Sequence, residues 1–339
     1  MSRHINIPIF IPHLGCPNQC VFCNQRTISG VKKFDQSLVR TQIDEVLSTV
    51  DSDADVEIAF FGGSFTGIDR KLMQSLLEIA YSYIESGRVQ AIRCSTRPDY
   101  INSEILGILK KYGVKTVELG LQTTSDSVLA LTKRGHNFEA EKHACKMIVE
   151  AGFSLVGQMM VGLPGADMAS EIRTAEFIAS IGASAARIYP TVVFKETELC
   201  AMAERGEYQP LSIDEAVERS AAVLEIFDSA GIDVIRIGLA ASDNLSSPDT
   251  YYAGPNHSSL GELVENELYY NKIRKLLAGK KIDSDTKINI YVPHGSLSKA
   301  VGQKKKNRIR LAVDYPNADI RFSELGSITG YGVLIVVDN

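Results

Sequence analysis

Three cysteines lie close together in the stretch GCPNQCVFCNQ, residues 15–25. Cys16, Cys20 and Cys23 have the spacing C-x3-C-x2-C, and no further cysteine occurs before Cys94. Thiolates at such short spacings are ligands for metal ions and iron–sulfur clusters. A disulfide framework is not expected, because a chain of 339 residues with 45% hydrophobic side chains can form a large core without cross-links. The cysteines therefore predict a metal or cluster site.

A four-iron cluster is the site that this spacing favours. Three thiolates leave one iron open, and an open iron can chelate the amino and carboxylate groups of a cofactor such as S-adenosylmethionine. Two alternatives stay open: a zinc site with His13 as the fourth ligand, and three unrelated buried cysteines. Structural zinc sites more often carry paired C-x2-C knuckles than a cysteine triplet.

Strand and helix patterns alternate through the first 240 residues. The strand candidates are short apolar runs, at residues 5–12, 55–62, 89–96, 115–122, 154–162, 184–190 and 233–239. Amphipathic stretches suited to helices lie between them. The alternation predicts an α/β fold in which residues 1–240 form a partial parallel (βα)6-type barrel. The active site of such a barrel lies at the carboxyl ends of the strands, where the cysteines follow the first strand.

The pattern changes near residue 241. Residues 241–257 are rich in Ser, Asp, Pro and Gly and predict a linker. Residues 258–339 then carry helix patterns and three short strand patterns. They predict a smaller α+β domain.

Charge and composition limit the partners and the location. The net charge is −5, with 36 basic and 41 acidic residues, so nucleic-acid binding requires a local basic patch. The first residues of the chain contain neither an apolar run long enough for a membrane helix nor a signal-peptide pattern. A cytoplasmic protein with no membrane partner is the expectation.

A glycine pair ends the second strand, in the stretch AFFGGSFTG at residues 59–67. Glycine lets the backbone approach a ligand closely, so the peptide groups of Gly62, Gly63 and Ser64 are candidates to bind the methionyl amino group of S-adenosylmethionine. The alternative is a plain turn after a strand.

The first 240 residues resemble the radical S-adenosylmethionine (radical SAM) superfamily, and more narrowly the radical domain of the catalytic subunit of Elongator, which modifies the wobble uridine of transfer RNA. Five stretches carry the resemblance in the same order: TRPDY (96–100), VELGLQTTSDSVL (117–129), KRGH (133–136), MMVGLPG (159–165) and RIYPTVVFKETEL (187–199). The resemblance implies a 4Fe-4S cluster and S-adenosylmethionine as cofactors. It also implies a reductant such as flavodoxin or ferredoxin, and chemistry through a 5′-deoxyadenosyl radical.

Further cofactor contacts follow from the same resemblance. Phe22 is the aromatic residue usual between the second and third cysteines, and Gln122, Arg134 and Gln158 take positions at which relatives contact the cofactor. By themselves, Gln122 fits a polar strand end equally well, and Arg134 fits a solvated loop cation.

The chain also departs from the Elongator pattern. Ser95 stands where relatives carry a glutamate, and the gap between the first two cysteines is shorter than in the Elongator subunit. No acetyltransferase domain follows the barrel, so acetyl-coenzyme A is not among the implied cofactors.

A basic segment lies near the end of the chain, where no acidic residue occurs from Lys287 to Val313. Residues 297–322 resemble a K-homology domain, closely the second such domain of a transcription elongation factor, in which a Gly-x-x-Gly loop clamps the nucleic-acid backbone. This loop falls at residues 302–305, with Lys305 in place of the second glycine. The candidate RNA-binding residues are Lys299, Gly302, Lys304, Lys305, Lys306, Arg308 and Arg310. A solvated basic face and a protein-docking surface remain alternatives.

The barrel and the basic segment together predict a radical SAM enzyme that modifies RNA. The resemblance to Elongator points to transfer RNA and to a wobble uridine. Two other functions stay open: a radical SAM enzyme that acts on a small molecule such as a porphyrin precursor, and an RNA-binding protein with a structural iron–sulfur cluster.

Overall fold

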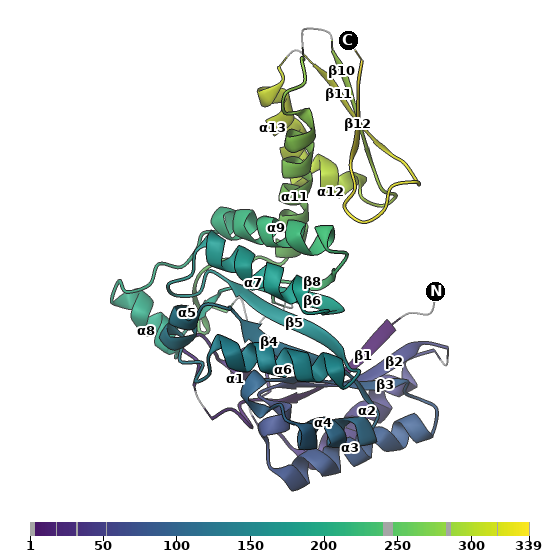
Figure 1. Ribbon diagram of the computed structural model, residues 1–339, viewed down its shortest axis with the longest axis vertical. Helices are drawn as coiled ribbons and strands as arrows, with labels where there is room; N and C mark the ends of the chain where they lie inside the picture. Colours follow the sequence, from purple (N-terminus) through teal and green to yellow (C-terminus); the bar gives the residue numbers. More distant parts are fainter. Residues whose placement is uncertain are drawn as a thin grey trace.

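A curled sheet of seven parallel strands forms the larger part of the molecule, in the order β1-β2-β3-β4-β5-β6-β8 (Figure 1). The computed structural model describes residues 4–338 apart from 18, 32, 52, 240–246, 283–285 and 317. The strands are β1 (His4–Ile11), β2 (Asp55–Gly62), β3 (Ala91–Thr96), β4 (Val114–Gln122), β5 (Ser154–Val161), β6 (Ala185–Pro190) and β8 (Asp233–Ile237). Every neighbouring pair is parallel, so their carboxyl ends meet at one edge. The predicted partial parallel barrel is confirmed.

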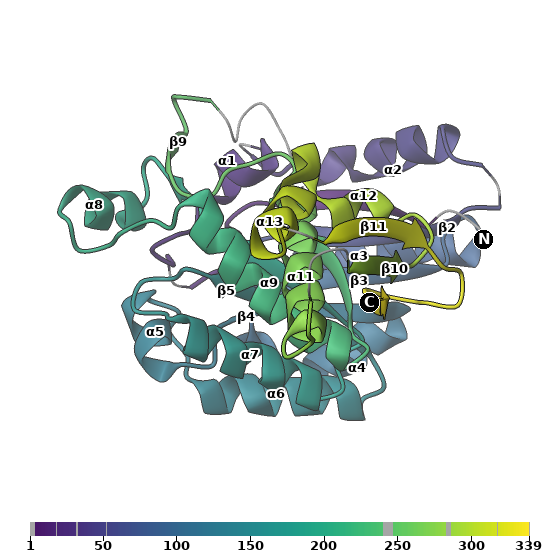
Figure 2. The ribbon, with the colours of Figure 1, turned by 90° about the horizontal axis from the view of Figure 1, so that it is seen from above.

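Helices cover the outer face of this sheet (Figure 2). The outer helices are α2 (Val39–Ser48), α3 (Arg70–Glu85), α4 (Ser103–Lys111), α6 (Phe138–Glu150), α7 (Met168–Ser180) and α9 (Ile213–Ser229). The shorter ones are α1 (Gln25–Ser29), α5 (Asp126–Leu131) and α8 (Glu198–Glu204). Capping boxes fix where two of them begin, Asp167 with Ser170 for α7 and Ser212 with Glu215 for α9. Within the described part of the chain, no helix combines the length and the apolar character that a membrane crossing requires.

Alternation along each strand separates the two faces of the sheet. On β1, Ile7, Ile9 and Ile11 are buried against the outer helices, whereas Asn6 and Phe10 point to the opposite, concave face. The concave face of a half-barrel is therefore free to carry polar side chains. This face holds the candidate site.

The C-terminal unit has its own three-stranded sheet, in the order β11-β10-β12, which rises above α9 in Figure 1. Strands β10 and β11 are parallel, and β12 is antiparallel to β10. The elements are α11 (Leu260–Leu277), β10 (Lys287–Val292), α12 (Leu297–Val301), α13 (Lys306–Asp314), β11 (Asp319–Glu324) and β12 (Leu334–Asp338). The predicted loop at residues 302–305 lies between α12 and α13. The K-homology resemblance itself remains a prediction.

Helix α11 joins the two units. Leu260, Val264 and Leu268 in its first half belong to the core of the barrel, whereas Tyr269 and Ile273 belong to the core of the C-terminal unit. The division into domains 1–240 and 258–339 stays a prediction, because one helix contributes to both cores.

The segment predicted as a linker lies partly outside the described residues, at 240–246. Farther along, residues Tyr251–Ala253 form strand β9, which pairs antiparallel with β7 (Val193–Phe194) of the barrel. Strand β9 has only three residues, which is too short to give a recognisable strand pattern in the sequence.

Candidate active site

A cavity of about 680 Å³ opens on the concave face of the sheet. It extends from the carboxyl edge of the strands, where the cysteines lie, to the middle of the sheet. Its lining includes all but one of the residues predicted to bind iron or cofactor: Cys16, Cys20, Phe22, Cys23, Gly62, Gly63, Gln122, Arg134 and Gln158. The exception is Ser64, which is fully buried and shares a 2.8 Å hydrogen bond with Thr96 through its hydroxyl group. The volume lies within the range of small-molecule and cofactor sites.

The glycine pair lets the cysteine loop pack against the end of β2. A Cβ on Gly63 would lie 2.1 Å from the carbonyl oxygen of Leu14, far inside any allowed contact. The N–H groups of Gly63 and Ser64 donate to the carbonyls of Ile11 and Leu14, at 2.8 and 3.1 Å. An ammonium group needs acceptors, so the carbonyls in this turn, and not its N–H groups, are the atoms suited to a methionyl amino group.

Cys16 and Cys23 lie in surroundings that disfavour the thiolate in the absence of a cation. Burial raises the pKa of Cys23 to about 12, and the neighbouring Cys20 and Cys16 add to this shift. Burial also raises the pKa of Cys16. Iron binding deprotonates such thiols, because the metal charge repays the cost of the buried anions.

The described residues contain no group of three His, Cys, Asp or Glu side chains that converges on a single metal ion. A four-iron cluster does not require such convergence, since each thiolate binds its own iron. His13, the fourth ligand in the zinc alternative, accepts a 3.0 Å hydrogen bond from the backbone N–H of Gln25 through Nε2.

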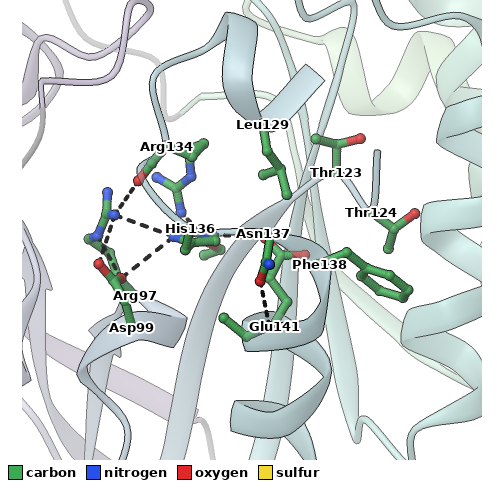
Figure 3. A network of polar contacts seen from close by, with 12 residues as sticks. Arg97, Asp99, Thr123, Thr124, Leu129, Arg134, His136, Asn137, Phe138 and Glu141 are labelled. Carbon is green, nitrogen blue, oxygen red and sulfur yellow. Dashed lines mark hydrogen bonds and ion pairs between the residues drawn. The ribbon is translucent and has the colours of Figure 1, made fainter. Parts of the chain in front are cut away.

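Two buried arginines face the sulfur of Cys20. Arg134 Nη1 lies 3.3 Å from this sulfur and Arg97 Nη1 lies 3.8 Å from it. Arg97 also donates to the backbone carbonyl of Arg134, so the two residues form one unit (Figure 3). Arg134, which is predicted to bind the cofactor, thus also contacts Cys20, a predicted iron ligand. Arg97 lies in the quoted stretch TRPDY, but the sequence did not single it out.

Gln122 carries a further sign of a ligand. It has a φ of +75°, which is strained for a residue with a side chain, and it ends β4 at the cavity. Its amide oxygen Oε1 is buried and has no hydrogen-bond partner among the described residues. A buried acceptor of this kind is expected to bind a donor of the cofactor. The three thiols, the two guanidinium groups and this acceptor fit a four-iron cluster with S-adenosylmethionine.

A second group of charged residues forms the floor of the cavity, and the sequence analysis missed it. Its centre is Glu118, whose carboxylate accepts hydrogen bonds from Gln158 at 2.8 Å, Arg93 at 2.9 Å and Arg187 at 3.0 Å. These side chains come from β4, β5, β3 and β6, and Glu118 is completely buried. Arg93 also donates to Glu57 at 2.6 Å. Gln158, predicted to contact cofactor, is therefore held by the floor, and it also reaches Ser95 at 3.4 Å.

The predicted RNA-binding residues divide into two sets. Three of the cations have acidic partners: Lys299 with Glu265 at 2.9 Å, Lys306 with Asp214 at 3.4 Å, and Arg310 with Glu267 at 2.5 Å. The guanidinium of Arg310 also stacks 3.4 Å from the ring centre of Tyr270.

The other three cations, Lys304, Lys305 and Arg308, are exposed. Lys304 and Lys305 have φ values of +53° and +63°, so Lys305 adopts the left-handed conformation that a second glycine would take. Gly302 is buried, because its Cα packs on the backbone of Asn307, where a Cβ would come within 2.9 Å.

Comparisons with known sequences identify the family. The profile of the Radical SAM superfamily matches residues 10–178, and that of the Radical_SAM C-terminal domain matches residues 183–270. A protein of Methanocaldococcus jannaschii named tRNA uridine(34) acetyltransferase is 29% identical over 183 residues, 48% of this chain and 34% of that protein. Elongator complex protein 3 of Saccharomyces cerevisiae is 24% identical over 256 residues, 63% of this chain and 46% of that protein. The chain thus spans less than half of these two relatives.

Two solved structures share the fold. The archaeal Elp3 of Methanocaldococcus infernus superposes with a TM-score of 0.62 at 22% identity, over 88% of this chain and 68% of that one. SuiB of Streptococcus suis, bound to S-adenosylmethionine, superposes with a TM-score of 0.51 at 11% identity, over 75% of this chain and 54% of that one. The chain belongs to the radical SAM superfamily, with a 4Fe-4S cluster and S-adenosylmethionine as its cofactors, and its barrel is homologous to the radical domain of Elongator complex protein 3.

Proposed function

We propose that this radical SAM enzyme modifies RNA, with transfer RNA as the substrate and a wobble uridine as the base. The observation that carries the proposal is the match of the barrel to proteins named tRNA uridine(34) acetyltransferase, one of them 34% identical over 138 residues. That match covers only 25% of the relative, so acetyl transfer does not come with it. The proposal therefore names the substrate and leaves the added group to experiment.

The cavity offers two regions for such a reaction. Cys16, Cys20 and Cys23 lie at one end, with Gln122 and Arg134 beside them. When bound there, the cluster and S-adenosylmethionine supply one-electron radical chemistry. The floor around Glu118 lies at the other end of the same cavity. A substrate group on the floor would therefore share one cavity with the cofactor.

The floor has the chemistry that an extruded nucleobase requires. Phe10, Phe61 and Tyr189 line this part of the cavity and offer aromatic faces for stacking. Arg93 and Arg187 carry N–H groups that can donate to base carbonyls, and the buried amide oxygen of Asn6 has no partner among the described residues. A uracil ring presents two acceptor carbonyls and one N–H donor on one edge, which complements this set.

The C-terminal unit supplies the contact to the RNA backbone in this proposal. Lys304, Lys305 and Arg308 are the cations in its loop and first helical turn that have no acidic partner among the described residues. Lys306 bridges to Asp214 at the start of α9, so the loop sits beside the barrel. Because α9 begins at the carboxyl edge of the sheet, RNA held by the loop lies on the same side as the mouth of the cavity.

Replacing Lys304, Lys305 and Arg308 together with alanine should weaken transfer-RNA binding and flatten its dependence on salt. Each lost phosphate contact reduces the slope of log K against log salt by about 0.7 to 0.9, so the triple variant should lose up to about 2 to 2.7. Fluorescence anisotropy with labelled transfer RNA, measured between about 50 and 300 mM salt, gives both the affinity and its dependence on salt.

The matched control replaces three lysines on the outer helices, Lys110, Lys142 and Lys146, and so has the same change of charge. It should bind transfer RNA with nearly the slope of the unmodified protein. Equal slopes for the two triple variants would show that the loop is not the RNA contact, and an absence of binding at low salt would favour a small-molecule substrate.

A further inference from the structure

Arg97 is the centre of a network of polar side chains (Figure 3), and it also faces Cys20, a predicted iron ligand. It follows β3, and its side chain is about 5% exposed. One edge of the guanidinium faces the sulfur of Cys20 at 3.8 Å. The opposite edge binds Asp99 through two hydrogen bonds, at 2.9 and 3.0 Å. The fork of the arginine is therefore fixed between a carboxylate and a thiol.

Behind Arg97 lies a second tier of buried polar groups. Arg97 Nη2 lies 3.3 Å from His136 Nδ1, and His136 Nε2 lies 3.0 Å from Glu141, which is completely buried. His136 Nδ1 also lies 3.6 Å from Asp99, so a His136 that is protonated on both nitrogens has a carboxylate beside each of them. Burial would raise the pKa of Asp99, but hydrogen bonds from His136 and Arg97 outweigh this effect and hold the pKa well below its usual range.

Such a network is costly to bury and needs a reason. The carboxylate of Glu141 and the guanidinium groups of Arg97 and Arg134 are buried away from water, while the side chain of Asp99 stays 25% exposed. Arg134 approaches the same sulfur at 3.3 Å, so two guanidinium groups face Cys20. The donors are thus directed at one ligand.

N–H groups and positive charge beside a ligand sulfur stabilise the more electron-rich state of an iron–sulfur cluster and raise its reduction potential. We propose that Arg97 is a positioning residue that tunes the cluster through Cys20, and that Asp99, His136 and Glu141 hold its guanidinium in place. The network makes the bound cluster easier to reduce by the physiological reductant. The inference rests on the cofactors of the superfamily and is independent of which substrate the enzyme modifies.

The test is a redox titration of anaerobically reconstituted protein, followed by the electron paramagnetic resonance signal of the reduced cluster. Arg97→Leu should bind iron, and at the midpoint potential of the unmodified protein its ratio of reduced to oxidised cluster should fall about tenfold. Glu141→Gln leaves Arg97 and Cys20 in place but weakens the support of His136. It should shift the ratio in the same direction by about threefold.

The control is Arg219→Leu, which breaks a buried ion pair with Glu171 between α9 and α7 and removes a hydrogen bond to the carbonyl of Ala166. It should leave the midpoint unchanged. If Arg97→Leu fails to load iron, the midpoint potential of the Glu141→Gln variant alone decides whether the network tunes the cluster. The inference is overturned if the iron-loaded variants keep the original midpoint, or if Arg219→Leu shifts it as much as Arg97→Leu does.

Discussion

Replacing Cys20 with alanine should abolish the cluster and all cleavage of S-adenosylmethionine. Cys20 is the middle cysteine of the predicted ligand triad, and its sulfur receives the contacts of Arg97 and Arg134. Two remaining thiols cannot hold three irons of a four-iron cluster, so iron content should fall from about four atoms per chain to near zero. Iron and sulfide assays of reconstituted protein, with 5′-deoxyadenosine measured by liquid chromatography, give both results.

The control is a triple variant of the other cysteines, Cys94, Cys145 and Cys200, each changed to alanine. These thiols are buried in strands and helices and behave as small apolar side chains, so their loss should cost about 1 kcal/mol of stability each and no iron. Loss of iron in the triple variant, with iron retained in Cys20→Ala, would refute the assignment of the ligands.

Changing Glu118 to glutamine should destabilise the barrel by about 3 to 5 kcal/mol. The carboxylate of Glu118 is completely buried and forms an ion pair with Arg187 at 2.9 Å. Neutralising it leaves the guanidinium charge of Arg187 buried and uncompensated. Arg93 retains Glu57 as a partner. Urea unfolding of the protein, followed by circular dichroism, measures the change in the free energy of unfolding.

An exposed carboxylate provides the comparison. Glu104 pairs with Arg70 at 3.7 Å, and its side chain is 68% exposed, so Glu104→Gln should change stability by less than about 1 kcal/mol. Similar small losses in both variants would mean that the floor of the cavity is well hydrated. The reading of the floor as a preorganised site for a polar substrate would then be wrong.

The cysteine spacing and the alternation of strands and helices were enough to predict a site on a loop after β1, at the carboxyl ends of the strands. The glycine pair was predicted from its place after a strand, and Gln122, Arg134 and Gln158 were predicted from the family resemblance. The cavity brings them together because parallel strands end at one edge. Ser64 differs, since its side chain turns toward Thr96 and away from the cavity. A glycine-rich turn does not reveal in sequence which of its residues faces a ligand.

The floor around Glu118 could not be predicted in the same way. Glu118 is separated from Arg93, Gln158 and Arg187 by 25, 40 and 69 residues in sequence, and each is an isolated polar side chain on an apolar strand. Only the order of the strands makes them neighbours. The acidic partners of Lys299, Lys306 and Arg310 lie on α9 and α11, which are also distant from the basic segment in sequence. The sequence analysis therefore overestimated the positive charge that the basic segment presents.

The measurement that tests the central claim most directly is a single anaerobic reaction. Reconstituted enzyme is reduced and incubated with S-adenosylmethionine, with and without unmodified transfer RNA, and the RNA is digested to nucleosides for mass spectrometry. The account predicts 5′-deoxyadenosine in both reactions, more of it with RNA, and a new uridine derivative that requires both the cofactor and Cys20. Cleavage of S-adenosylmethionine that RNA does not stimulate, together with an unchanged nucleoside profile, would contradict the account.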